Sequence, residues 1–117
     1  MTFEQARDLI LRETWGDLPA SYVVSIRMGE DPGPERMATL LAALKILHDG
    51  LRGQTQIDRR LAYCLYCLAT YIPANLKSWS KAGATWRDDL VGDEQLRLGL
   101  AVESIFEGTW EDLYLTD

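Results

Sequence analysis

The sequence predicts an all-α protein: a compact helical bundle of about five main helices plus short helical turns, in a single domain over residues 1–117. Two patterns predict this fold. Apolar residues recur along most of the chain at the three- and four-residue spacing of amphipathic helices. Threonines that precede an acidic or amide residue by three positions mark repeated helix starts. An apolar fraction of 47% and a charged fraction of 26% are typical of a chain that folds by itself around one core.

Five threonines have the spacing of a capping box. In this motif the hydroxyl accepts from the amide three residues on, and the side chain there bonds back to the threonine amide. The five pairs are Thr2–Gln5, Thr14–Asp17, Thr55–Asp58, Thr85–Asp88 and Thr109–Asp112. Three of them extend to Thr-Trp-x-Asp, at uneven intervals along the chain. Because a solenoid needs a constant period, we interpret the motif as a reused helix cap and not as a structural repeat.

The N-terminal part is predicted to begin with a helix from about Phe3 to Thr14. The next segment, residues 18–28, is ambiguous, because its apolar residues alternate as in a strand and also recur at every fourth position. We favour a helix over a strand there, since a lone strand has no sheet to join. Residues 29–34 contain two prolines and two glycines, which predict a loop.

The clearest amphipathic pattern predicts a helix from Glu35 to Asp49. Pro34 suits the first position of this helix, because the amide that proline lacks has no partner there. Gly50 is expected to end the helix in the left-handed conformation.

Residues 57–72 carry apolar or aromatic side chains around nearly the whole circumference, which predicts a helix at the centre of the bundle. Pro73 should end or kink it, before a short helix over 74–81. Asp93 is expected to cap a last long helix over 94–107, which the glycine after it should end. The apolar arc of that helix contains Leu98, Ala101, Val102, Ile105 and Phe106.

The net charge of −6 is unevenly distributed. Residues 1–32 and 88–117 carry net charges of −3 and −8, whereas residues 33–87 carry +5. The acidic ends can neutralise the basic middle once the chain is compact, which disfavours nucleic-acid binding. The segment 77–87 combines three basic residues with two tryptophans, and we expect its indoles to pack onto the bundle and not to stack on bases.

The composition predicts a cytoplasmic protein. No apolar run reaches the length of a membrane span, and the first residues are acidic and amphipathic, unlike a signal peptide. Two cysteines fit a reducing compartment.

Residues with catalytic or metal-binding chemistry do not form a recognisable constellation. Cys64 and Cys67 form a C-x-x-C in mid-helix, which indicates buried thiols more than a redox pair or half of a zinc site. His48, the only histidine, lies beside an apolar stripe without a nucleophile or an orienting carboxylate at a suitable spacing. The acidic run from Asp88 to Glu94 lacks the pattern of a calcium loop. We therefore expect no enzyme activity, no metal and no cofactor.

The C-terminal region holds the most suggestive surface. Leu96 and Leu100 share a helix face with Glu103 and Glu107, opposite the main apolar arc. These leucines are either covered by the C-terminal tail, residues 110–115, or exposed to a partner. Covering by the tail is the simpler interpretation. An acidic rim around an apolar centre suits binding to a basic partner surface. We expect Trp110, Glu111 and Asp112 to belong to the same partner-binding surface.

Two functional hypotheses follow. The first is a small acidic protein that binds a basic protein surface, as an inhibitor of the immunity or antitoxin type or as a regulatory subunit. The second is a helical protein that binds a small molecule or nucleotide near the central helix 57–72, at His48, Tyr63, Cys64 and Tyr66. Self-association through the same aromatic side chains is a further option.

Overall fold

The computed structural model describes residues 1–15 and 21–110, and within them the chain forms helices joined by turns and loops, without strands. The elements are α1 (Phe3–Trp15), α2 (Tyr22–Arg27), α3 (Pro34–Leu51), α4 (Arg59–Tyr66), the π-helical turn η1 (Cys67–Tyr71), α5 (Ile72–Lys81), the π-helical turn η2 (Leu90–Glu94) and α6 (Gln95–Glu107). Because η1 joins α4 to α5 and η2 leads directly into α6, the described residues form five continuous helical segments. The predicted all-α bundle is confirmed.

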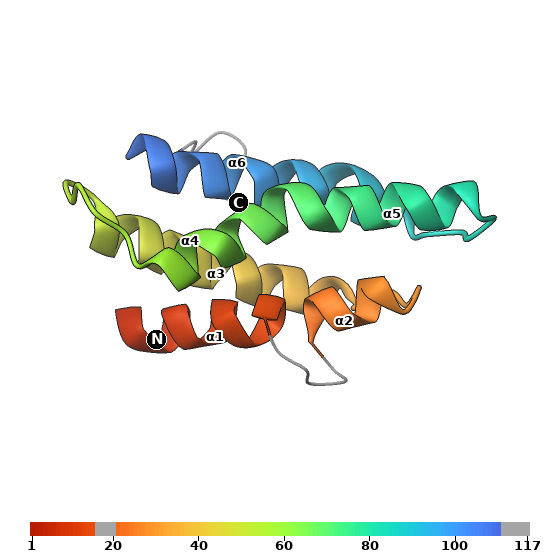
Figure 1. Ribbon diagram of the computed structural model, residues 1–117, viewed down its shortest axis with the longest axis horizontal. Helices are drawn as coiled ribbons and strands as arrows, with labels where there is room; N and C mark the ends of the chain where they lie inside the picture. Colours follow the sequence, from red (N-terminus) through yellow and green to blue (C-terminus); the bar gives the residue numbers. More distant parts are fainter. Residues whose placement is uncertain (16–20, 111–117) are drawn as a thin grey trace.

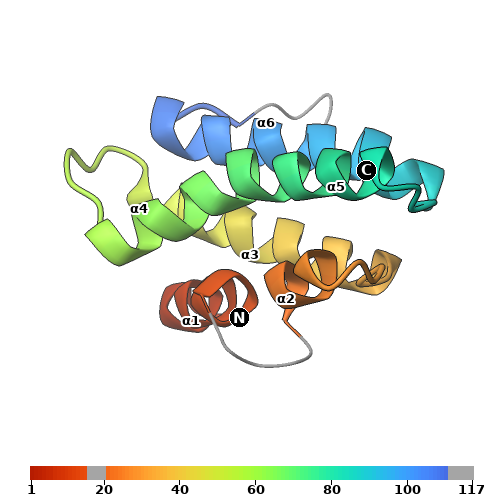
Figure 2. The same cartoon turned by 45° about the vertical axis from the view of Figure 1, so that its right-hand side comes forward.

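The helices stack in layers. In Figure 1, α1 and α2 lie along one side, α6 lies along the opposite side, and α3 and the continuous α4–η1–α5 path run between them. Figure 2 shows the same order after a 45° turn. The helix α3 packs against α1 and α6, while α4 packs against α1 and η1 against α6. The centre is therefore shared by two segments, and α3 is the more deeply buried of them.

The buried apolar side chains form one cluster to which every α-helix contributes. Ile10, Leu44, Leu65 and Leu98 lose essentially all contact with solvent. Each such side chain contributes about 2 kcal/mol by its removal from water. The tyrosines of α4 do not share this burial, because Tyr63, Tyr66 and Tyr71 are exposed, so the aromatic residues of the expected central helix cover only part of its circumference.

One of the five capping boxes forms as predicted. The Thr2 amide donates to Gln5 Oε1 at 2.8 Å, and the Gln5 amide donates to Thr2 Oγ1 at 3.1 Å, at the start of α1. The prediction for Thr14 is wrong: this residue lies inside α1, and its buried hydroxyl donates to the Ile10 carbonyl at 2.6 Å. Ser21 caps α2 instead, since its hydroxyl accepts from the Val24 amide. Asp17 lies outside the described residues.

Two further boxes do not start their helix at the threonine, and Asp112 of the fifth box, Thr109–Asp112, lies outside the described residues. Asp58, not Thr55, is the cap of α4, and its carboxylate accepts from the Leu61 amide at 3.3 Å. After Thr85, helical residues begin only at Asp88. Asp93 lies inside η2 and does not cap α6. Both threonine and aspartate are good caps, so the packing of nearby apolar residues decides which one is used.

Two predicted helix boundaries, at Pro34 and Gly108, are confirmed, and the one at Gly50 is not. Pro34 is the first residue of α3, and Gly108 ends α6 with a φ of 85°, its amide donating to the Ser104 carbonyl at 2.8 Å. In the ambiguous segment 18–28, residues 22–27 are helical, so the favoured interpretation is confirmed there. Residues 18–20 of that segment lie outside the described residues. Gly50 does not end α3, because the helix continues through it to Leu51.

Pro73 neither ends the helical path nor separates it into two helices. The preceding turn, η1, widens so that the Ile72 amide donates to the Cys67 carbonyl, five residues back. Proline has no amide hydrogen, and its ring collides with the carbonyl four residues earlier in a regular α-helix. A single π-helical turn relieves this collision and keeps α4 and α5 in one path.

Arg87 ties the loop before α3 to the start of the last helical segment. Its guanidinium donates to both carboxylate oxygens of Asp31, at 2.9 and 3.1 Å, and Nη2 lies 2.9 Å from the buried Glu94 Oε2. The contact with Glu94 is ionic and not an aligned hydrogen bond. The hydrogen bond from Arg87 holds the pKa of Asp31 below its ordinary value, and the two carboxylates raise the pKa of Arg87.

We predict that Asp31→Asn lowers the free energy of unfolding at pH 7 by about 1 kcal/mol. Because the folded pKa of Asp31 is lowered, its contribution is present above the ordinary value of about 3.9 and is lost as the pH falls through the folded pKa. Urea unfolding followed by circular dichroism at pH 7 and at pH 3 measures this. Asp88→Asn, at an exposed aspartate, is the control. An equal loss at both pH values would contradict the prediction.

Gly50 allows α1 to approach α3 closely. A Cβ atom there would lie 2.7 Å from Cε2 of Phe3. We predict that Gly50→Ala destabilises the protein by about 1 kcal/mol or more, because overcrowding outweighs the helix-forming advantage of alanine. Gly99→Ala is the matched control, since a Cβ atom at Gly99 meets no atom within 4 Å, and it should stabilise by about 0.5–1 kcal/mol.

The same urea unfolding experiment compares both alanine variants with the wild type. In a Phe3→Ala background, Gly50→Ala should no longer destabilise, because the colliding ring is absent. A stabilising effect of Gly50→Ala in the wild-type background would show that the Phe3 ring moves aside freely.

Candidate functional site

The predicted partner-binding face lies on the side of α6 that points away from the core. The regular helix Gln95–Glu107 places its residues at spacings of three and four on one side. We call this set the α6 outer face: Leu96, Gly99, Leu100, Glu103, Phe106 and Glu107. Leu96 is 54% exposed and both glutamates are exposed, whereas Leu100 is partly buried against the core. Among residues 1–15 and 21–110, the bundle thus covers Leu100 but leaves Leu96 exposed, and the tail after Trp110 lies outside the described residues.

Phe106 was expected to be buried and is not. Its neighbours on the apolar arc, Val102 and Ile105, are buried, but Phe106 is 57% exposed. The periodicity placed it at the edge of a broad arc, and the edge of such an arc is covered only if another helix extends over it. The result is a second large apolar side chain on the α6 outer face.

Trp110 does not extend this face. Its indole packs on α3, where the ring centre lies 5.3 Å from that of His48 and 5.1 Å from Lys45 Nζ. This contact holds the chain after α6 against the bundle. Glu111 and Asp112 lie outside the described residues.

His48 is buried near the end of α3. Its Nδ1 lies 3.0 Å from Asp49 Oδ1, and its Nε2 has no hydrogen-bond partner among the residues that the structure describes. The hydrogen bond with His48 is the main cause of the lowered pKa of Asp49. His48 lines a hollow of about 240 Å³ with Lys45, Arg52 and Trp110.

The structure separates the residues of the predicted small-molecule site. Tyr63 and Tyr66 stack with their ring centres 6.5 Å apart on the exposed side of α4. Cys64 points into the core, where burial raises the pKa of its thiol. His48 lies in a different hollow, which shares no lining residue with the one beside Tyr63. The four residues therefore do not form one site.

Cys64 and Cys67 are free thiols, and both are buried. A raised pKa keeps Cys64 protonated near neutral pH, which is unfavourable for thiol chemistry. Within residues 1–15 and 21–110, His, Cys, Asp and Glu side chains form no group of three that could hold a metal ion. None of the helices described there is long and apolar enough to cross a membrane.

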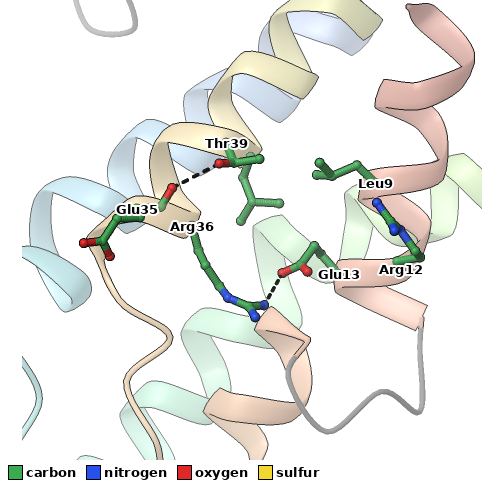
Figure 3. Close-up of a pocket in the computed structure, with 7 residues that line it drawn as sticks. Leu9, Arg12, Glu13, Glu35, Arg36 and Thr39 are labelled. Carbon is green, nitrogen blue, oxygen red and sulfur yellow. Dashed lines mark hydrogen bonds and ion pairs between the residues drawn. The ribbon is translucent and has the colours of Figure 1, made fainter. Parts of the chain in front are cut away.

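A hollow of about 300 Å³ lies between α1 and α3, and Figure 3 shows Glu13 and Arg36 pointing toward one another within it. Glu13 Oε2 accepts from Arg36 Nη1 at 2.8 Å and from the Tyr22 amide at 3.0 Å. One carboxylate thus joins α1, α2 and α3. Glu13 lies at the end of the otherwise apolar inner face of α1, and these contacts show that its role there is structural.

A larger hollow, of about 860 Å³, lies between α1, α2 and the α4–η1 path. We call it the arginine groove, because Arg7, Arg27, Arg59 and Arg60 line it together with a single acidic residue, Asp58. Its only sign in the sequence is weak: the Arg59-Arg60 pair directly after the cap of α4. The other two arginines lie more than thirty residues away along the chain.

Two features are not explained by packing within the described residues. One is the exposed apolar side chains of the α6 outer face, and the other is the group of arginines in the arginine groove. No protein-family model matches the chain, and no significant match is found among curated proteins or among solved structures.

Proposed function

We propose that the protein binds a partner protein with a basic surface through the α6 outer face. The observation that carries the proposal is the exposure of Leu96 and Phe106, each by more than half, beside the exposed carboxylates of Glu103 and Glu107. Large apolar side chains that gather on one face and are rimmed by charge are typical of protein–protein interfaces.

The apolar part of this face supplies the affinity. Transfer of a leucine or phenylalanine side chain from water to a packed interface is favourable by about 1.5–3 kcal/mol. Gly99 lies between these two residues, and a Cβ atom placed on it would meet nothing within 4 Å. A partner side chain can therefore approach the backbone of α6 closely and fill the space between Leu96 and Phe106.

The charged part supplies orientation and choice of partner. Residues 88–117 carry a net charge of −8, and two of their carboxylates, Glu103 and Glu107, flank the apolar residues directly. Acidic side chains at the rim attract a basic surface and reject an acidic one. A small acidic protein of this kind suits an inhibitor of the immunity or antitoxin type, or a regulatory subunit.

We predict that the immobilised protein captures a basic partner from an extract of its native cells, and that Leu96→Ser/Phe106→Ser weakens this binding at least about tenfold. Met28→Ser is the matched control, because Met28 is 64% exposed and lies away from α6. Binding is measured by calorimetry once the captured protein has been identified and purified.

Charge reversal tests the acidic rim separately. Glu103→Lys should weaken binding several-fold, and the wild-type affinity should fall as the salt concentration rises. Glu30→Lys makes the same charge change at an exposed position outside the face and should leave the affinity unchanged. A partner that binds the serine double variant and Glu103→Lys as tightly as the wild type would contradict the proposal.

A further inference from the structure

We propose a second binding site that goes beyond the proposed function: the arginine groove binds a small phosphorylated ligand that carries an aromatic ring, of the nucleotide class. The groove encloses about 860 Å³, a volume within the usual range for small-molecule sites. The ligand class is that of the second hypothesis from the sequence, but the groove shares only Tyr63 with the residues predicted there.

Three separate elements bring positive charge into this groove. Arg7 comes from α1, Arg27 from the last turn of α2, and Arg59 and Arg60 from the first turn of α4. A third of the twelve basic residues of an acidic chain thus line one hollow. Like charges repel one another, and such a group is more stable when an anion occupies the space between them.

The acidic residue in the groove, Asp58, forms an ion pair with Arg7. Asp58 Oδ2 accepts from Arg7 Nη2 at 2.8 Å, which fixes that guanidinium at the wall. Neither Arg27 nor Arg59 forms an ion pair with a carboxylate among the residues that the structure describes. Guanidinium groups hydrogen-bond two phosphate oxygens at once, which makes arginine well suited to phosphate groups.

Beyond Arg59 and Arg60, the side of the groove formed by α4 and η1 is aromatic. Tyr63, Cys67 and Tyr71 follow at four-residue intervals along α4 and η1, so they point to the same side. A hydrogen bond with the Cys67 sulfur raises the pKa of Tyr63 and keeps its phenol neutral. The rings of Tyr63 and Tyr71 are both exposed, so their faces are accessible for stacking with a planar ring.

The π-helical turn is part of this wall. Cys67 and Tyr71 are the first and last residues of η1, and the wider turn moves the following side chains around the helix axis relative to a regular α-helix. Turns of this kind occur often at functional sites. Tyr71, at the end of this turn, lines the groove, while Leu68 and Ile72 remain in the core.

The charge distribution favours a small ligand over a nucleic acid. The four arginines of the groove lie together in a chain whose net charge is −6 and whose terminal regions are both acidic. A long polyanion would extend beyond the groove and meet acidic surface, whereas a compact ligand with one to three phosphate groups would not.

The test is calorimetric titration of the whole protein with adenosine and guanosine mono-, di- and triphosphates, and with inorganic phosphate, pyrophosphate and the unphosphorylated nucleosides. We expect at least one nucleotide to bind with a dissociation constant below about 1 mM, and nucleosides and inorganic phosphate to bind at least about tenfold more weakly. Absence of binding by every nucleotide at millimolar concentration would overturn the proposal.

Two variants locate the site. Arg27→Ala/Arg59→Ala should weaken nucleotide binding at least about tenfold, because both guanidiniums contribute charge-assisted hydrogen bonds. Arg12→Ala/Arg52→Ala removes the same charge from exposed positions outside the groove and should leave binding unchanged. Circular dichroism confirms that both variants are folded. Equal binding by the wild type and the groove variant would overturn the proposal.

A third variant tests the aromatic wall. Tyr71→Leu keeps an apolar side chain but removes the ring, so it should weaken nucleotide binding several-fold and leave pyrophosphate binding unchanged. If pyrophosphate binds as tightly as any nucleotide and Tyr71→Leu has no effect, the aromatic part of the proposal is wrong.

Discussion

The widened turn at Cys67–Tyr71 is the constraint on which much of the fold depends. Pro73 would break a regular helix, yet the π-helical turn keeps α4 and α5 in one path. That path supports its neighbours: the Leu76 carbonyl accepts from Trp86 Nε1 at 3.1 Å, and Trp79 Nε1 donates to the Arg27 carbonyl at 3.2 Å. The direction of α5 therefore fixes both α2 and the chain that leads into α6. Both indoles thus contact the bundle through these hydrogen bonds, as expected from the sequence.

Charged residues divide into those that hold the bundle together and those that remain on its surface. Glu13 joins three helices through Arg36 and the α2 amide, and Arg87 joins the loop before α3 to Glu94. These contacts account for the charges between the layers. Among the other charged residues, Glu103 and Glu107 are exposed on the α6 outer face, and four arginines line the arginine groove. A protein of this size thus presents two surfaces of opposite charge, and the two proposals assign a basic protein to one and a phosphorylated small molecule to the other.

Comparison of particular residues shows how far the sequence predicts this structure. The amphipathic spacing predicts the bounds of α1, α3 and α6 to within one or two residues. The reason is that the buried side of each helix is visible in the spacing of its own apolar residues. The capping boxes were less reliable: Thr2 caps its helix, but Thr14 lies inside α1 and Asp58 replaces Thr55. A cap contributes about 1 kcal/mol, which is less than the burial of one leucine, so packing determines where these helices begin.

The sequence by itself determined the helical class, the inner sides of the long helices and the acidic side of α6, since these depend on contacts between residues three or four apart. Only the tertiary structure decided which of those sides stay uncovered, as Phe106 and Tyr63 show. It also decided that Arg7, Arg27 and Arg59 meet in one groove although more than fifty residues separate the first from the last. Helix periodicity is local, whereas the covering of a face and the convergence of charges depend on how helices distant in the sequence pack against one another.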